Sequence, residues 1–225
     1  MQCTAPTRPR VQIRPDVWLD GRLALWLAGP RALVVADLHW GYVESHRAQG
    51  NLLPAWGDAD IARRLAELVA DYSPGEMIWL GDSLHTLAGR SAAESFLRSS
   101  PVPVTIVAGN HDKRWDRAVG DVRVRRGNFF LHHGDQSCDV PSETIEIVGH
   151  LHPALSWQDG AGTRLKLPAL VATERRLILP AFSPWAAGAP WKLGTTGETV
   201  YAIGGKRIFT VSPELLQKTP YSNSR

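Results

Sequence analysis

Five short apolar runs in this sequence each end in a polar turn that carries side chains able to bind a metal ion. The turns are Asp37-Leu38-His39, Gly81-Asp82, Gly109-Asn110-His111-Asp112, His132-His133-Gly134-Asp135 and Gly149-His150-Leu151-His152. One such turn alone fits a structural turn as well as a site. Apolar runs of this length and composition are typical of buried strands, and α/β proteins place their chemistry at the carboxyl ends of strands. The five turns together therefore predict one shared site.

Nitrogen and oxygen donors dominate these turns. We expect seven metal ligands: Asp37, His39, Asp82, Asn110, His133, His150 and His152. If Asp82 bridges with both carboxylate oxygens, each of two cations receives four protein ligands. The absence of a thiolate points to manganese, iron, zinc or cobalt. Strand alternation lets only one of His132 and His133 face the site; we choose His133, which precedes Gly134, and the reverse order stays open.

Two divalent cations ~3.5–4 Å apart suit in-line displacement at phosphorus, because they orient a metal-bound hydroxide and neutralise charge on the attacking and leaving oxygens. His111 is the histidine of the central turn that the ligand count leaves over. We expect it to protonate the departing oxygen and to act with Asp82 as a catalytic residue.

Basic residues lie in segments next to these turns. Arg47 is a candidate phosphate contact, and we expect it to bind substrate together with Asn110 and His111. Further basic residues follow the central turn: Lys113, Arg114, Arg117, Arg123, Arg125 and Arg126. Together with a net charge of +3 they suit an anionic substrate. The alternative is one exposed strand face that carries charge for solubility.

The periodicity of the chain predicts the elements that position these residues. We expect a hairpin of residues 17–19 and 23–27 around Asp20-Gly21, strands over 33–36, 77–80 and 104–107, a long loop over 40–54, helices over 58–72 and 91–99, and β-rich structure after residue 152 that builds a second sheet. Asp58 is the expected cap of the first helix. We assign the adjacent Arg63 and Arg64 to its solvated face.

Composition sets the broad class of the protein. With 225 residues and 44% hydrophobic content, we expect a single domain over residues 1–211 and a flexible tail over 212–225. No apolar run approaches the ~20 residues that span a bilayer, and Met1–Arg10 lacks the apolar segment of a signal peptide. We therefore expect a cytoplasmic protein with no membrane partner. Cys3 and Cys138 predict no disulfide framework.

The ordered series of five motifs from Asp37 to His152 resembles the calcineurin-like binuclear metallophosphoesterase superfamily. This resemblance implies an α/β fold, a four-layer αββα sandwich of two mixed β-sheets. It also implies a division of the ligands, with one metal held by Asp37, His39, Asp82 and His152 and the other by Asp82, Asn110, His133 and His150. In the same comparison His111 matches the histidine that contacts substrate and assists the leaving group.

A narrower resemblance extends over most of the chain. Its residues are Asp37-Leu38-His39-Trp40-Gly41 followed by Arg47, Gly50 and Pro54, then Gly149-His150-Leu151-His152-Pro153, Leu167-Pro168 and Leu179-Pro180-Ala181-Phe182. The pattern resembles the ligase-associated DNA damage response metallophosphoesterases (PdeM). That family implies a manganese-dependent DNA endonuclease and phosphodiesterase in DNA repair, with a DNA ligase, an exonuclease and a helicase as functional partners.

Our leading hypothesis is a binuclear metal-dependent phosphodiesterase or nuclease that acts on single-stranded or flexible DNA. The enzymatic alternative is a small-molecule phosphatase or a nucleotide phosphodiesterase. An open cleft beside the basic residues favours the nuclease, and a capped pocket favours the alternative. A third hypothesis is a scaffold on the same fold that binds protein partners without catalysis. The complete set of ligands argues against the scaffold.

Overall fold

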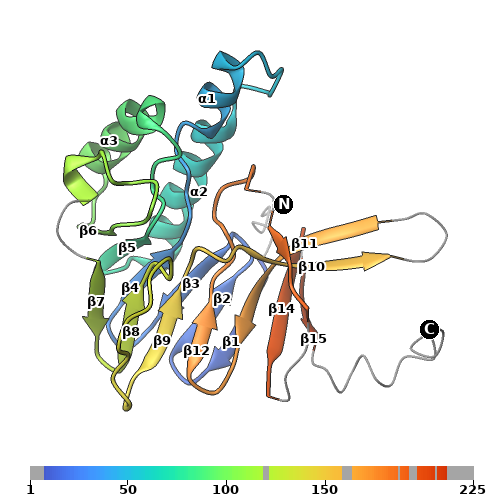
Figure 1. The fold of residues 1–225 in the computed structure, drawn as a ribbon. Coiled ribbons are helices and arrows are strands. Elements are labelled where there is room, and N and C mark those ends of the chain that lie inside the picture. The colour runs from blue at the N-terminus through green and yellow to red at the C-terminus, as the bar shows by residue number, and fades with distance from the viewer. Residues whose placement is uncertain are drawn as a thin grey trace, which may run out of the picture.

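The computed structural model describes residues 8–118, 122–158, 164–186, 188–192, 197–205 and 207–211. These residues form two β-sheets, with helices stacked against one side (Figure 1). The tail expected over residues 212–225 lies outside the described residues. Within the described part, no helix is long and apolar enough to cross a membrane.

The first sheet has six strands in sequence order, and its later strands are parallel. Its members are β1 (Arg10–Arg14), β2 (Val17–Asp20), β3 (Ala24–Leu27), β4 (Ala32–Val35), β5 (Glu76–Leu80) and β6 (Val104–Val107). The strands β4, β5 and β6 run parallel, so their carboxyl ends share one edge. The predicted hairpin is present, but its loop has three residues, because Asp20 pairs with Ala24 and Leu23 takes a left-handed backbone with φ of 69°.

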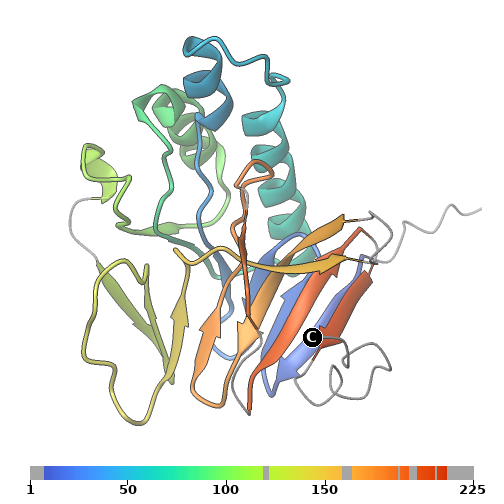
Figure 2. The same ribbon diagram turned by 45° about the vertical axis from the view of Figure 1, so that its right-hand side comes forward.

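The second sheet is also mixed and contains nine strands. They are β7 (Arg123–Arg126), β8 (Phe129–His132), β9 (Ile145–Val148), β10 (Pro153–Gln158), β11 (Arg164–Ala172), β12 (Arg176–Ile178), β13 (Ala189–Pro190), β14 (Thr199–Gly204) and β15 (Arg207–Val211). Three neighbours, β8, β9 and β12, run parallel. Turned by 45°, the molecule shows the yellow-to-red strands of this sheet in front of the blue strands of the first (Figure 2). The predicted β-rich second sheet is confirmed.

Three α-helices lie on the outer side of the first sheet: α1 (Tyr42–Ala48), α2 (Gly57–Tyr72) and α3 (Arg90–Ser99), with short 3-10 turns η1 (Leu87–Gly89) and η2 (Asp116–Ala118) (Figure 1). The prediction of an unstructured loop over residues 40–54 is wrong, because α1 lies within it. Asp58 also does not cap α2. Its carboxylate accepts hydrogen bonds of 3.0 and 3.2 Å from the backbone N–H of Gly41 instead.

Alternating side chains of the first sheet build two apolar layers. Val34 and Ile78 face the second sheet, where they join a cluster that includes Leu131 and Ile147. Leu33, Val35, Met77 and Trp79 face the helices and pack with Ile61, Leu65, Leu68 and Phe96. Because both faces of β4 and β5 are buried, these strands read as continuous apolar runs.

These layers confirm the predicted α/β class with two mixed sheets. The described residues contribute no helix to the outer face of the second sheet, where Val148, Val171 and Val200 form a small cluster covered in part by Trp191. The carboxyl ends of β4, β5 and β6 in one sheet and of β8 and β9 in the other lead into the five polar turns, which therefore meet between the sheets.

Candidate metal centre

The backbone at the ends of these strands is unusual. Nine non-glycine residues of the described chain have positive φ, and five of them are expected metal ligands: Asp37, His39, Asp82, His150 and His152, with φ between 43° and 62°. Residues with a Cβ avoid this left-handed region unless surrounding contacts hold them there, and such residues concentrate at functional sites. The expected ligands therefore occupy a backbone geometry that the fold imposes.

Glycine at two of the turns allows the side chains to approach closely. A Cβ on Gly81 would lie 2.0 Å from Nδ1 of His133, and a Cβ on Gly109 would lie 2.3 Å from Oδ1 of Asp82. Neither distance is possible for real atoms. Gly81 thus lets the turn after β5 approach His133 of the second sheet, and Gly109 lets the turns after β5 and β6 of the first sheet pack together.

One group of candidate ligands consists of Asp37, His39 and His152, whose nearest ligand atoms all lie within 4.8 Å of one another. Oδ1 of Asp37 is 3.1 Å from Nε2 of His152, but without hydrogen-bond geometry. Nε2 of His152 and the buried Nδ1 of His39 have no hydrogen-bond partner among the described residues. A buried polar atom without a partner is costly, and a cation bound by these donors would remove that cost.

The second group consists of Asp82, His133 and His150, again with ligand atoms within 4.8 Å of one another. Nε2 of His133 lies 3.3 Å from Oδ1 of Asp82, 3.3 Å from Oδ1 of Asn110 and 3.2 Å from Nδ1 of His150. This nitrogen is therefore surrounded by three potential ligand atoms. His132 turns the other way, and its Nε2 is 2.7 Å from Oε1 of Glu146.

Asp82 belongs to the second group and also contacts the first, because its carbonyl oxygen accepts a 3.0 Å hydrogen bond from the backbone N–H of His39. Its Oδ1 faces His133, whereas its Oδ2 lies 4.0 Å from Nε2 of His111, whose ring is 5.2 Å from that of His39. A carboxylate with two oxygens beside different histidine nitrogens is suited to a bridge between two cations. Oxygen and imidazole donors without sulfur fit manganese, iron, zinc or cobalt.

The electrostatics of the centre also suit a metal site. Burial lowers the pKa of His39 to about 3, so this imidazole is neutral and offers a lone pair. Burial alone would raise the pKa of Asp82, but the hydrogen bond and charge of His133 hold it below its ordinary value. The pKa of His133 is raised, because the nearby Asp82 and Asp37 outweigh burial. The carboxylates of Asp82 and Asp37, 3.3 and 3.8 Å from the ring nitrogens of His133, thus make this position favourable for positive charge.

Asp112 closes the central turn and has a role that the sequence did not indicate. Its buried carboxylate accepts three backbone hydrogen bonds, from Ser83 at 3.1 Å, Leu84 at 2.9 Å and Gly109 at 3.1 Å. These bonds tie the turn after β5 to the turn after β6. Burial raises the pKa of Asp112 although these bonds oppose it. Asp112 therefore positions Asp82 and Asn110 relative to each other.

His85 is a second residue whose place the sequence did not resolve. Taken alone, a loop histidine is most often a surface residue, but here His85, His39 and His111 have ring nitrogens within 4.8 Å of one another. The rings of His85 and His111 stack at 5.4 Å, and Nδ1 of His111 is 3.2 Å from the carbonyl oxygen of His85. Tyr42 of α1 packs on His85 at 4.6 Å. The signal that could have found His85 is its position three residues after Asp82.

The basic residues do not form one cluster. Arg125 pairs with Glu143 at 3.2 Å, and Arg126 pairs with Glu76. Arg47 is exposed in α1, and its guanidinium donates a 2.8 Å hydrogen bond to the carbonyl oxygen of Leu53. Lys113 and Arg123 line a surface pocket of ≈170 Å³ that also touches Gly109 and His133. The expected contact between Arg47 and substrate stays a prediction.

Comparison with known proteins identifies the family. The family model for the calcineurin-like phosphoesterases matches residues 30–196, which include all seven expected ligands. The chain belongs to the calcineurin-like phosphoesterase family. Divalent metal binding is a property of this family, and the two histidine and aspartate groups supply the donors for it.

Two solved structures are similar to this chain. The crystal structure of the Pseudomonas putida nuclease MPE is similar over 91% of this chain and 100% of its own, with 25% identity and a TM-score of 0.71. YfcE, a phosphoesterase from E. coli, is similar over 80% of this phosphoesterase and 98% of its own chain, with 18% identity and a TM-score of 0.46. A search of curated proteins found no match.

Proposed function

We propose that this phosphoesterase is a binuclear metal-dependent phosphodiesterase that cleaves single-stranded or flexible DNA. The observation that carries the proposal is the presence of two groups, Asp37–His39–His152 and Asp82–His133–His150, in each of which the ligand atoms lie within 4.8 Å of one another. Two bound cations would activate a water molecule for attack at phosphorus and neutralise the developing charge. The proposed sets are Asp37, His39, Asp82 and His152 for one ion and Asp82, Asn110, His133 and His150 for the other.

The chain supplies the leaving-group chemistry with His111. Its side chain is 37% exposed beside the ligand groups, and its backbone N–H donates a 2.9 Å hydrogen bond to Oδ1 of Asp82. That bond fixes the turn, while the ring stays accessible to a substrate. We infer that His111 gives its proton to the oxygen of the departing nucleoside, and that Asn110 contacts the same phosphate.

The surroundings of the centre favour a chain-like substrate over a small one. The expected ligands open onto three surface pockets of ≈170, ≈210 and ≈230 Å³, which meet the centre at His133, His111 and His152. Each pocket contains at least one basic side chain: Lys113 and Arg123 in the first, Arg114 in the second and Lys166 in the third. Cations spaced around a reacting phosphate suit a backbone with several phosphates.

The name of the similar Pseudomonas putida protein, a nuclease, supports this choice of substrate. The motif resemblance to the ligase-associated family further supports manganese as the cation, a role in DNA repair, and a DNA ligase, an exonuclease and a helicase as functional partners. We also propose that the protein acts in the cytoplasm. We also propose that residues 1–211 act as one domain.

The test compares three substrates with one preparation. Chelated enzyme is supplied with manganese and incubated in parallel with single-stranded DNA, an aryl phosphodiester and an aryl phosphomonoester. We expect cleavage of the DNA and of the phosphodiester, with slower turnover of the phosphomonoester. Hydrolysis of the monoester alone would instead favour a small-molecule phosphatase. Metal binding without hydrolysis of any substrate would favour the scaffold.

A further inference from the structure

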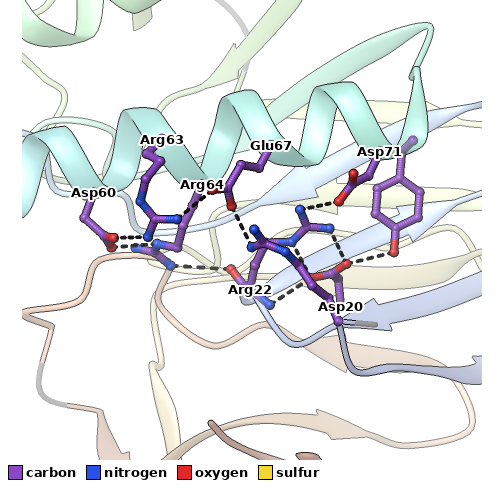
Figure 3. Close-up of polar contacts among 9 residues, drawn as sticks. Asp20, Arg22, Asp60, Arg63, Arg64, Glu67 and Asp71 are labelled. Carbon is purple, nitrogen blue, oxygen red and sulfur yellow. Dashed lines mark hydrogen bonds and ion pairs between the residues drawn. The ribbon is translucent and has the colours of Figure 1, made fainter. Parts of the chain in front are cut away.

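Arg63 and Arg64 are neighbours on α2 but have different surroundings. Arg63 is exposed and pairs with Asp60 at 2.5 Å and Glu67 at 2.7 Å. Arg64 is only 9% exposed, so the prediction that both arginines lie on a solvated face is wrong for Arg64. Figure 3 shows the polar contacts that surround the pair along α2, extending from Asp60 to the turn at Asp20 and Arg22.

The guanidinium of Arg64 holds the chain at Phe182. Nη2 donates a 2.6 Å hydrogen bond to the carbonyl oxygen of Phe182, and the guanidinium carbon lies 4.1 Å from the centroid of the Phe182 ring. Nε donates a 2.8 Å hydrogen bond to Asp60, which fixes the plane of the group. Phe182 is fully buried. A planar group that donates to the carbonyl and stacks on the ring of the same residue determines both the position and the orientation of that residue.

Phe182 and the next residue in turn hold the backbone of the first metal ligand. The N–H of Phe182 donates a 2.8 Å hydrogen bond to the carbonyl oxygen of Ala36, and the N–H of Ser183 donates one of 3.1 Å to that of Asp37. Residues 181–185, which we call the strap, thus run beside the end of β4. Asp37 needs such support, because its φ is 55°.

The far end of the strap is also anchored on α2. The ring of Trp185 packs on that of Trp56 at 5.0 Å, and a Cβ on Gly57 would lie 2.6 Å from Nε1 of Trp185. The strap is therefore fixed near α2 at Phe182 and at Trp185, and the amide of Ser183 between them donates to the carbonyl oxygen of Asp37.

We propose that Arg64 is a positioning residue: through the strap it holds Asp37 in the geometry that the Asp37–His39–His152 group needs to bind its cation. This inference rests on the proposed binuclear function. We expect the strongest effect on the Asp37 group, because Asp82, His133 and His150 have no direct bond to the strap among the described contacts, and the second group meets it only through Asp37, whose Oδ2 accepts a 3.0 Å hydrogen bond from the backbone N–H of His150. A lysine can replace it only in part, since an ammonium has N–H donors on a single nitrogen but no flat face to stack on the ring of Phe182 and no planar fork of donors.

The experiment measures manganese binding rather than activity. Chelated wild type, Arg64→Met, Arg64→Lys and the matched control Arg63→Met are titrated with Mn²⁺, and the electron paramagnetic resonance spectrum is recorded at each step. His152→Ala marks the ion that belongs to the Asp37 group. We expect wild type to bind two ions with a spin-coupled signal. Arg64→Met should bind the marked ion at least tenfold more weakly and should show the spectrum of an isolated ion. Arg64→Lys should lose part of this affinity. Arg63→Met should bind both ions as wild type does.

Thermal melting separates positioning from simple stabilisation. If Arg64→Met melts earlier but binds the marked ion with wild-type affinity, the proposal is overturned. If Arg64→Met does not fold, Phe182→Leu removes the ring under the guanidinium and keeps the amide of the strap; it should weaken the same ion, and unchanged affinity would overturn the proposal as well. A wild type that binds no second ion contradicts the proposed function instead, which keeps the two failures distinct.

Discussion

Oδ1 of Asp82 lies 3.3 Å from Nε2 of His133, in a pair that is almost entirely buried. The other oxygen of Asp82, Oδ2, lies 4.0 Å from Nε2 of His111. A neutral amide at this position cannot neutralise two cations. We therefore expect Asp82→Asn to lower phosphodiesterase activity at least ~100-fold and to reduce bound manganese from two ions to one or none, which metal analysis after gel filtration measures.

The matched control for this change is Asp116→Asn, which removes an exposed carboxylate in η2, beyond the central turn. It should leave both activity and metal content unchanged. Asp82→Asn with two bound ions and wild-type turnover would show that Asp82 does not bridge the cations.

His111 gives a prediction that depends on the leaving group. A general acid is worth ~10²–10⁴-fold, and it matters most when the departing oxygen is strongly basic. His111→Ala should reduce cleavage of single-stranded DNA by about that factor but reduce hydrolysis of a nitrophenyl phosphodiester much less, with unchanged metal content. Single-turnover rates on both substrates measure the difference. Equal losses on both would make His111 a residue that positions the phosphate.

The pocket of Lys113 and Arg123 gives a prediction about salt. Each contact to a phosphate of single-stranded nucleic acid contributes ~0.7 to the log-log slope of affinity against salt. Replacing both residues by serine should therefore reduce the slope by about 1.4 and weaken binding. DNA affinity is measured in Ca²⁺, chosen to suppress cleavage. Hydrolysis of a small aryl phosphodiester should not change.

Two other exposed basic residues provide the control for the salt experiment. Arg31 precedes β4 at the sheet edge opposite the centre, and Arg98 lies on α3. Replacing both by serine should leave the slope as in wild type. Equal slopes for both double variants would remove Lys113 and Arg123 from the DNA-binding surface.

Asp58 gives a prediction about stability and pH. Burial raises its pKa to about 6, above the ordinary value of 3.8, so folding disfavours its charged form. The resulting loss of folding free energy is absent below pH 4 and complete above pH 7. Asp58→Asn keeps an oxygen that can accept from Gly41. It should raise the free energy of unfolding by about 1 kcal/mol at pH 8, after allowance for partial exposure, and leave it unchanged at pH 4. Urea unfolding at both pH values measures this, and a variant less stable at pH 8 would contradict it.

The strands could be predicted from the sequence because an apolar run followed by a polar turn is a local pattern. The convergence of the turns could be predicted because parallel strands place their carboxyl ends at one edge of the sheet. Runs such as Val104–Val107 end directly at the polar residues, and strand alternation limits one side chain of His132-His133 to the cleft. The structure places His133 beside Asp82 and turns His132 to Glu146. The choice between His132 and His133 follows from the alternation of side chains along a strand, and the closeness of the turns follows from the shared edge of parallel strands.

Contacts between distant elements explain what the sequence could not predict. The short helix α1 buries one side chain, Val43, and starts at a left-handed Gly41, so it lacks the apolar stripe that marks a helix. Arg64 follows another arginine in the sequence, a pattern typical of a solvated helix face. In the structure it is buried against Phe182, a residue distant in sequence that no local pattern indicates. Asp58 lies at the start of α2, but its carboxylate accepts a hydrogen bond from the backbone N–H of Gly41 instead of capping the helix.

The central claim, hydrolysis by two cations bridged by Asp82, is tested most directly by one titration. Chelated enzyme receives Mn²⁺ in steps, and bound metal per chain and the rate of phosphodiester hydrolysis are measured in the same samples. We predict negligible hydrolysis without metal, little with one ion bound, and the full rate only as the second ion binds. Full activity in metal-free enzyme, or activity that saturates at one ion per chain, would contradict it.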